Sequence, residues 1–364
     1  MKFIEEYRDP ELGKKILERI HRRSKKPARL MEFCGGHTVA IFKHGLRQLL
    51  PPNIEMLSGP GCPVCVTAAA DLDKAIALGK APGVIITSFG DMVRVPGSSS
   101  SLQQAKAEGA DVRIVYSAQD ALAIARENPE KSVVFIGIGF ETTAPTIAAS
   151  VLQAERENID NYYVLSFHKA TPPVMQAICK LGEVKLNGII CPGHVSVVIG
   201  SMPYEFLAKD YNIACAVSGF EPVDILLAVY QLVEQIESDS PQVEIAYRRG
   251  VKPEGNPAAL KLMNTVFEAG GADWRGIGIV PASGLQLKKQ YERFDAAKNF
   301  DVKVVPAKEP EDCICGAVLR GVSTPPECRL FRKACTPEHP VGPCMVSSEG
   351  SCATYYQYGG DDGR

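Results

Sequence analysis

The chain has 364 residues, of which 45% are hydrophobic and 23% are charged. This length favours two or three domains, and the composition is typical of a soluble globular protein. The formal net charge of −2 excludes a global field that would attract nucleic acid or an anionic membrane. The first residues contain no apolar export signal, and no stretch reaches the roughly 18 apolar residues of a membrane-spanning helix. We therefore expect a cytoplasmic protein.

The opening segment predicts a helix, because Asp9 can cap it, Pro10 suits its first position and residues 11–23 have helical spacing. Short apolar runs then alternate with amphipathic stretches as far as residue 238. Strands are predicted at 29–33, 54–58, 84–89, 112–117, 133–139, 162–167, 188–193 and 213–220, and helices at 38–50, 67–79, 146–158 and 223–238. Such alternation indicates βαβ units and parallel sheets.

The fold class expected from this pattern is α/β, with two parallel-sheet, Rossmann-like domains and an irregular C-terminal domain. We place an N-terminal helix in residues 1–28, packing on the C-terminal domain, and the two α/β domains in 29–120 and 121–225. The C-terminal domain takes residues 226–364. After residue 300 the strand–helix alternation stops and seven prolines follow, so this segment needs a staple to fold.

Nearly every predicted strand runs into a glycine-rich polar turn, and these turns contain Cys34 with His37, Cys62 with Cys65, Asp91, Glu141, His194 and Glu221. The carboxyl ends of parallel strands form the ligand-binding crevice of such sheets. Because six turns share Cys, His, Asp or Glu, we expect one common site. His168 and His194 could line it, and Arg94 is expected to pair with Asp91.

Twelve cysteines in a reducing compartment favour metal binding or catalysis over structural disulfides. Cys179, Cys191 and Cys215 lie in apolar or helical contexts and are expected to be small buried hydrophobes. The tail spacing Cys315-x12-Cys328-x6-Cys335-x16-Cys352 differs from the tight knuckles of structural zinc sites. It favours a four-cysteine [4Fe–4S] cluster, with zinc and disulfides as alternatives. Spacing alone does not separate Cys313 and Cys344 from these four.

The front cysteines allow several kinds of site. Cys62-Pro-Val-Cys65 has the form of a redox dithiol, in which a helix N-terminus lowers the pKa of the first thiol. If the strands before Cys34 and Cys62 are neighbours, three thiols and the imidazole of His37 could hold Fe(II) or zinc. Alternatively, Cys34 is a nucleophile with His37 as its base. That reading needs an orienting acid, for which Asp91, Glu141 and Glu349 are candidates.

With these motifs in place, the sequence resembles the HypD family of hydrogenase maturation factors. The matching stretches start at Cys34 (CGGHT), Gly59 (GPGCPVC), Phe89 (FGDMVRVPG), Gln104 (QAKAEGADVRIVYS), Gly137 (GIGFETTAPT), Pro192 (PGHVSVVIG), Gly219 (GFEPVDIL) and Cys344 (CMVSSEGSCATYYQY). They span nearly the whole chain. One departure is Val39, where many members have a second histidine, and this removes one outer ligand.

The resemblance implies a scaffold rather than a conventional turnover enzyme. With the small chaperone HypC, it would hold iron while cyanide and CO are assembled into the Fe(CN)2CO group of [NiFe]-hydrogenase. HypE would deliver cyanide, and the apo hydrogenase large subunit would receive the product. By motif, Cys34, Cys62 and Cys65 would be iron and redox thiols, surrounded by His37, Asp91, His194 and Glu349. The family pattern assigns the tail cluster to Cys315, Cys328, Cys335 and Cys352, and the cluster would pass electrons to the Cys62–Cys65 pair. A plain ferredoxin–thioredoxin-type redox module, or a zinc or cysteine hydrolase, remains the alternative.

Overall fold

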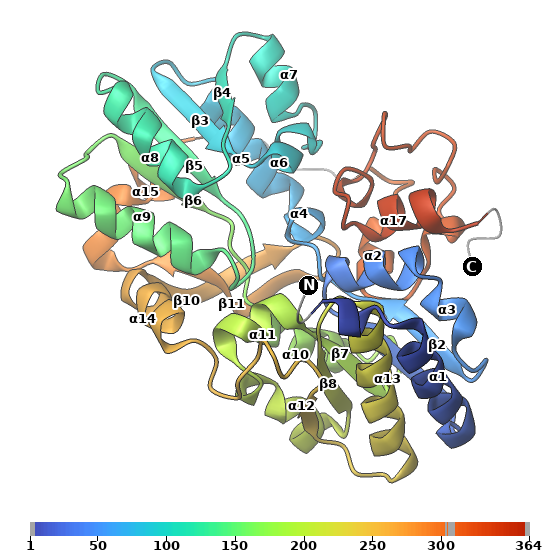
Figure 1. Ribbon diagram of the computed structural model, residues 1–364. Coiled ribbons are helices and arrows are strands. Elements are labelled where there is room, and N and C mark those ends of the chain that lie inside the picture. The colour runs from blue at the N-terminus through green and yellow to red at the C-terminus, as the bar shows by residue number, and fades with distance from the viewer. Residues whose placement is uncertain (1–3, 303, 305–309, 361–364) are drawn as a thin grey trace.

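Two parallel sheets, each covered by helices on both faces, form the body of the protein (Figure 1). The computed structural model describes residues 4–302, 304 and 310–360. Parts of the expected first and last domains, at residues 1–3, 303, 305–309 and 361–364, lie outside the described residues. The predicted α/β class is confirmed, and each predicted strand of the alternating region forms within a few residues of its expected place.

The five-stranded sheet has the order β2-β1-β7-β8-β9 and is parallel throughout. Its strands are β1 (Ala28–Glu32), β2 (Ile54–Ser58), β7 (Gly188–Pro192), β8 (Ala214–Ser218) and β9 (Val243–Ile245). One face is covered by α1 (Pro10–Arg23), α2 (Gly35–Lys43), α3 (Leu46–Leu49) and α13 (Pro222–Glu237). The other is covered by α10 (Thr171–Leu181), α11 (Gly193–Ile199) and α12 (Glu205–Tyr211).

The four-stranded sheet has the order β4-β3-β5-β6 and is also parallel. Its strands are β3 (Val84–Ser88), β4 (Asp111–Ile114), β5 (Ser132–Gly137) and β6 (Tyr162–Ser166). One face packs against α8 (Ala118–Glu127), α9 (Ala144–Arg156) and α14 (Pro257–Val266). The other packs against α5 (Ala69–Gly79), α6 (Gly90–Arg94), α7 (Leu102–Ala107) and α15 (Ala296–Asn299).

The two sheets do not follow the expected division at residue 120. Strand β3, inside the expected segment 29–120, pairs with β5, inside 121–225, in one sheet. Strand β1 pairs with β7 across the same boundary. The four-stranded sheet is thus inserted between β2 and β7 of the other. Local periodicity predicts strands but not their partners, because pairing is set by long-range packing.

The segment after residue 225 contributes to both sheets before the tail begins. Helix α13 covers the five-stranded sheet, and α14 packs on α9. The antiparallel hairpin of β10 (Phe267–Trp274) and β11 (Gly278–Leu287) reaches Lys169, just beyond β6, through a bridge at Gly284. The N-terminal helix α1 lies on α13, with Ile16 and Ile20 buried in their interface. Its contact with the expected segment 226–364 is therefore made through α13.

The tail has little regular structure, as its prolines predicted. It contains α16 (Cys315–Leu319), α17 (Ser351–Tyr358) and short 3₁₀ turns at Pro325–Glu327 and Pro343–Met345. Outside the tail, further 3₁₀ turns lie at Glu5–Tyr7, Met202–Tyr204 and Lys289–Phe294. Helix α17 lies against α2 (Figure 1). Across the described residues, no helix combines the length and apolar character needed to cross a membrane.

Candidate metal and thiol site

Cys34 and the Cys62–Cys65 pair lie in two adjacent loops at the carboxyl edge of the five-stranded sheet. Cys34 follows β1 and caps α2, and Cys62 follows β2 and caps the single-turn helix α4 (Pro63–Val66). Because β1 and β2 pair in parallel, both loops emerge at the same edge. The amide of Gly35 donates to the carbonyl of Gly61 at 3.1 Å. The expected adjacency of the two strands is confirmed.

Glycine is required where these loops touch. A Cβ added to Gly61 would lie 2.3 Å from the backbone nitrogen of Cys34. A Cβ on Gly35 would lie 2.3 Å from the carbonyl oxygen of Glu349, which belongs to the tail. The glycines of the two motifs therefore let three segments from distant parts of the chain approach one another closely.

Glu32 is a buried carboxyl group beneath Cys34. Its Oε2 accepts the amide of Cys34 at 3.0 Å, and its Oε1 accepts the hydroxyl of Thr38. Burial raises the pKa of Glu32 to about 8, so this acid holds a proton at neutral pH. Desolvation, followed by the charge of Glu349, also raises the pKa of Cys34 to about 12. A metal ion would have to displace the proton of that thiol.

Cys65 has the thiol of the pair that ionises more readily. Burial opposes ionisation, but hydrogen bonds from Cys344 and Cys62, together with the nearby guanidinium of Arg275, lower the pKa of Cys65 to about 5. Burial raises the pKa of Cys62. The helix N-terminus does act on the first thiol, since the amide of Cys65 donates to Sγ of Cys62 at 3.2 Å. Burial outweighs this donor, so the lowered pKa lies at the second thiol and not at the first as expected.

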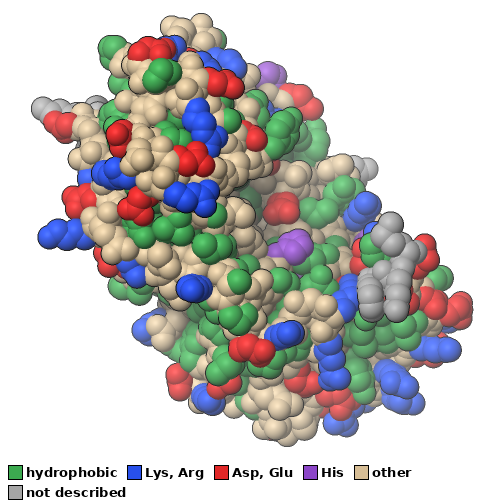
Figure 2. All heavy atoms as spheres, turned by 60° about the vertical axis from the view of Figure 1, so that its left-hand side comes forward, with side chains coloured by type: hydrophobic (Ala, Val, Ile, Leu, Met, Phe, Trp, Pro, Cys, Tyr) green, Lys and Arg blue, Asp and Glu red, His purple; other side chains and the backbone are tan. Residues whose placement is uncertain are grey.

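Asp91 and Glu349 are acidic groups on the exposed side of the thiols. Asp91 follows β3 of the four-stranded sheet, and Arg94 lies 3.7 Å from it, as expected, while donating to the carbonyl of Val346 in the tail. Partial desolvation, then the charges of Cys65 and Asp91, raise the pKa of Glu349. The face in Figure 2 is hollowed near its middle, where a histidine and an acidic side chain are exposed.

His37 and His194 are both brought to this edge, but to different depths. His37 is fully buried, and its Nε2 donates to the carbonyls of Gly219 at 3.0 Å and Ser218 at 3.3 Å. His194 lies in the first turn of α11 and is exposed. Desolvation lowers the pKa of both imidazoles, that of His37 to about 4. Both rings are therefore neutral near pH 7.

Two other candidates have structural contacts instead. The carboxylate of Glu141 accepts the amide and the hydroxyl of Thr171 at 2.8 and 2.9 Å, at the start of α10. His168 is buried beside Phe267 and bonds through Nδ1 to Ser166. Glu141 therefore does not orient His37, because its carboxylate is already hydrogen-bonded elsewhere. The Nε2 of His37 is held by backbone carbonyls instead.

All six tail cysteines line one small cavity: Cys313, Cys315, Cys328, Cys335, Cys344 and Cys352. The sulfurs of Cys315 and Cys344 lie 2.7 Å apart. Cys344 also interacts with the thiols of Cys352 and Cys65, so it joins the tail thiols to the front pair. Within the described ranges, no three Cys, His, Asp or Glu side chains form a ready-made metal-ligand geometry.

Arg275, Glu32 and Phe220 are site residues that the sequence reading missed. The guanidinium of Arg275 is buried, and its Nε donates to the carbonyl of Thr67 beside the Cys62–Cys65 helix. Phe220 stacks on both His37 and His194. A signal existed for Phe220 and Glu32, since each adjoins or lies in a quoted motif. None existed for Arg275, which reaches the thiols on a long-range hairpin.

Comparison with known proteins identifies the family. The HypD model, described as "Hydrogenase formation hypA family", matches residues 11–359. The chain belongs to the HypD family. Hydrogenase maturation factor HypD of Rhodobacter capsulatus is 46% identical over 372 residues, covering 99% of each chain. The HypD proteins of Cupriavidus necator and Escherichia coli are each 44% identical, covering 99% and 98% of this chain and 97% and 98% of their own.

The HypD resemblance predicted from the motifs is therefore confirmed, and hydrogenase maturation is the setting in which the site has to be understood. The motifs that carry the resemblance lie mostly where strands end. Four motifs lie at the ends of strands of the five-stranded sheet, namely CGGHT, GPGCPVC, PGHVS and GFEP. Two lie at the ends of strands of the four-stranded sheet, namely FGDMVRVPG and GFETT.

Proposed function

We propose that this protein is a scaffold on which an iron ion is held while cyanide and CO ligands are added to it. Cys34, Cys62 and Cys65 would bind the iron, which is cargo rather than a resident cofactor. A small HypC-type chaperone would share the ion, a HypE-type protein would donate cyanide, and the hydrogenase large subunit would receive the Fe(CN)2CO group.

The observation that carries this proposal is the convergence of three thiols at one sheet edge in a member of the HypD family. Cys34 and Cys62 lie at the ends of paired strands, in loops joined by a backbone hydrogen bond. Soft thiolates suit low-spin Fe(II) bearing strong-field ligands such as cyanide and CO. Glu349, on the exposed side, has a raised pKa and would accept a proton released when the thiols bind the metal.

The tail thiols fit a [4Fe–4S] cluster by their chemistry. Cys315, Cys328, Cys335 and Cys352 lie around one cavity in a segment with little helix or strand, and such a cluster is held by four thiolates. When bound, the cluster would supply single electrons. Its loss would leave the proline-rich tail without a covalent staple. Cys344, between Cys315 and Cys65, provides thiol contact between the two sites.

Oxidation or reduction of the Cys62–Cys65 pair would control whether the iron stays bound. Oxidation of Cys62 and Cys65 would form one S–S bond, break their two sulfur–iron bonds and pass two electrons to an external disulfide, which becomes a dithiol. Cys62→Ser cannot form that bond. We expect this variant to hold or transfer the iron complex at least tenfold less well, with Cys179→Ser on α10 as the control. A Cys62→Ser protein that loads and transfers normally would refute this control of iron binding.

The experiment that tests the proposed function is metal analysis and infrared spectroscopy of anaerobically purified protein with its small chaperone. About four irons with labile sulfide, and bands in the cyanide and CO stretching region, support the scaffold. Cluster signals without those bands would favour a plain redox module. Zinc without sulfide would contradict the proposal and favour a hydrolase.

A further inference from the structure

Three aromatic rings from three separate strand ends form a stack beside Cys34. The ring of Phe220, which follows β8, lies between the imidazoles of His37 and His194. The centroid distances are 4.6 Å to His37 and 3.9 Å to His194, with interplanar angles of 23° and 24°. His37 is buried, Phe220 is half-buried and His194 is exposed, so the stack runs from the interior to the surface.

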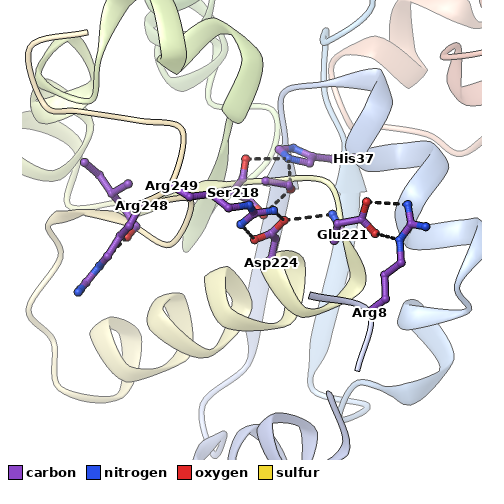
Figure 3. Close-up of polar contacts among 9 residues, drawn as sticks. Arg8, His37, Ser218, Glu221, Asp224, Arg248 and Arg249 are labelled. Carbon is purple, nitrogen blue, oxygen red and sulfur yellow. Dashed lines mark hydrogen bonds and ion pairs between the residues drawn. The ribbon is translucent and has the colours of Figure 1, made fainter. Parts of the chain in front are cut away.

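The loop that carries Phe220 is fixed on its far side by charged groups (Figure 3). The carboxylate of Glu221 accepts both Nε and Nη2 of Arg8, the latter at 2.8 Å. The amide of Glu221 donates to Asp224, which in turn forms a two-pronged ion pair with Arg249 at 2.6 Å. Arg249 stacks on Tyr7 at 3.5 Å. The backbone on both sides of Phe220 is therefore held in place.

The same loop also sets the tautomer of His37. Its Nε2 faces the carbonyl oxygens of Ser218 and Gly219, so that nitrogen carries the proton. In the neutral ring, Nδ1 then has a free lone pair, and this buried atom has no hydrogen-bond partner among the described residues. The plane of the imidazole is fixed by Phe220, and its proton is placed by the two carbonyls.

Phe220 and the thiol of Cys34 flank the same glycine. A Cβ built on Gly36 would lie 3.0 Å from Cε1 of Phe220 and 3.7 Å from Sγ of Cys34. Imidazole nitrogens bind first-row metals such as zinc at about 2.0–2.1 Å. Two imidazoles on one ion must therefore approach within a few ångströms of each other. A phenyl ring between His37 and His194 prevents that approach.

We infer that Phe220 is a positioning residue that keeps His194 away from the ion held by Cys34 and leaves His37 as the single imidazole on that side. The inference rests on the proposed function. His37 lies in the first turn of α2, which Cys34 caps, whereas His194 lies on the solvent side of the ring. The two histidines thus lie differently: the unpartnered Nδ1 of His37 is buried in the turn that Cys34 caps, and His194 is exposed against Phe220.

The test compares Phe220→Leu with Phe220→Tyr, which keeps the ring. In protein with no iron at Cys34, Cys62 and Cys65, NMR of the histidine ring protons should show the ring-current shift of His194 in wild type and Phe220→Tyr, and its loss in Phe220→Leu. In iron-loaded protein, Phe220→Leu should move the cyanide and CO bands to lower frequency, because a second imidazole adds electron density to the iron. Transfer to the hydrogenase should fall roughly tenfold or more.

The decisive variant is the double change Phe220→Leu/His194→Ala. If His194 binds the iron in Phe220→Leu, its removal returns the bands to their wild-type positions. Unchanged bands in Phe220→Leu, or shifted bands that the double variant does not restore, would contradict the role inferred for Phe220. Either result would leave the proposed function standing. Wild-type protein without any such bands would remove the proposed function, and the inference with it. Circular dichroism of each variant establishes that the fold is retained.

Discussion

At the scale of single residues, the environment of Cys65 shows how a buried thiol can favour its ionised form. Its sulfur is fully buried, yet the thiols of Cys344 and Cys62 donate to it and the guanidinium of Arg275 lies near. Burial by itself would raise the pKa of this thiol. The balance is reversed by donors and positive charge from the tail and from the hairpin β10–β11, so the second thiol of the pair depends on two distant segments.

Replacement of Arg275 by methionine should raise the pKa of Cys65, because the variant loses the positive charge that favours the thiolate. We expect the ionisation of this thiol to move to a higher pH. The measurement is thiolate ultraviolet absorbance against pH in reduced protein that keeps the tail cluster and has no iron at Cys34, Cys62 and Cys65, with Cys65→Ser subtracted to isolate this sulfur. Arg275→Lys keeps the charge and should titrate near the wild-type pH. Identical titrations for Arg275→Met and wild type would show that the charge is unimportant.

The reactive residues of the site could be predicted from the sequence, but the residues that hold them in place or shift their pKa values could not. Cys34, Cys62, His37 and Asp91 were predicted because reactive side chains at strand ends are expected to share a crevice, and the structure brings them to neighbouring loops. Arg275 could not be predicted, because an arginine on a hairpin has no local mark of its destination. Glu32 reads locally as an ordinary strand residue, and only its burial beneath Cys34 makes it a neutral acid.

At the scale of elements, the tail is docked on α2 through a few close contacts. Tyr355 of α17 packs against Phe42 of α2 with ring centroids 4.3 Å apart and the rings tilted by 50°, and its hydroxyl accepts Nη1 of Arg47 in the following helix α3 at 2.5 Å. Gly35 touches the backbone of Glu349. These contacts place Cys344 beside Cys65, so the relation between the two cysteine sites depends on the packing of α17 and α2.

Gly35→Ala should loosen this docking, since the added methyl group would lie 2.3 Å from the carbonyl oxygen of Glu349. Overpacking of this kind costs about 1–3 kcal/mol. We expect faster tryptic cleavage between residues 320 and 333 than in wild type, measured by mass spectrometry over time. The matched control is Gly271→Ala, whose methyl would meet only Ile279 at an ordinary 3.7 Å. Equal cleavage rates for Gly35→Ala and wild type would contradict the prediction.

Most predicted elements formed, but α8, α10 and α14 were not predicted although their apolar residues have helical spacing. Helix α1 begins at Pro10 with Asp9 as its cap, as expected, and the side chain of Asp9 accepts the amides of Glu11 and Leu12. The hairpin β10–β11 was missed because β10 is rich in glycine and alanine and is mostly exposed, and because the buried residues of β11 do not alternate regularly with exposed ones. Its stability comes from contacts with the end of β6 and from buried Trp274, which local pattern does not reveal.

At the scale of the whole molecule, the five-stranded sheet is interrupted in sequence by the four-stranded one. Every strand was predictable, but the partnership of β1 with β7 joins residues more than a hundred positions apart. Such pairing is decided by which apolar faces bury one another, and a boundary drawn from strand order alone divided both sheets. The arrangement places Asp91, from one sheet, on the exposed side of thiols from the other.

The stability of the molecule should depend on pH through buried groups with shifted pKa values. Burial, and then the charge of Lys169, lower the pKa of His168 to about 3, so the unfolded chain binds a proton that the folded one does not. Stability therefore falls as pH drops from about 6.5 toward 3. Burial raises the pKa of Glu141 to about 7. The folded state keeps that proton longer, so stability from this group falls as pH rises from about 4.5 to 7.

His168→Asn should therefore flatten the acid side of the stability profile. The wild type should lose on the order of 3 kcal/mol more than this variant between pH 7 and pH 4, because only the wild type gains a proton at this position on unfolding. The measurement is the free energy of unfolding in urea, for reduced and metal-free protein. Glu141→Gln is the matched variant of opposite sign, since it should remove the part of the loss that appears as pH rises toward 7. Parallel profiles for wild type and His168→Asn would show that the imidazole is already protonated in the folded protein.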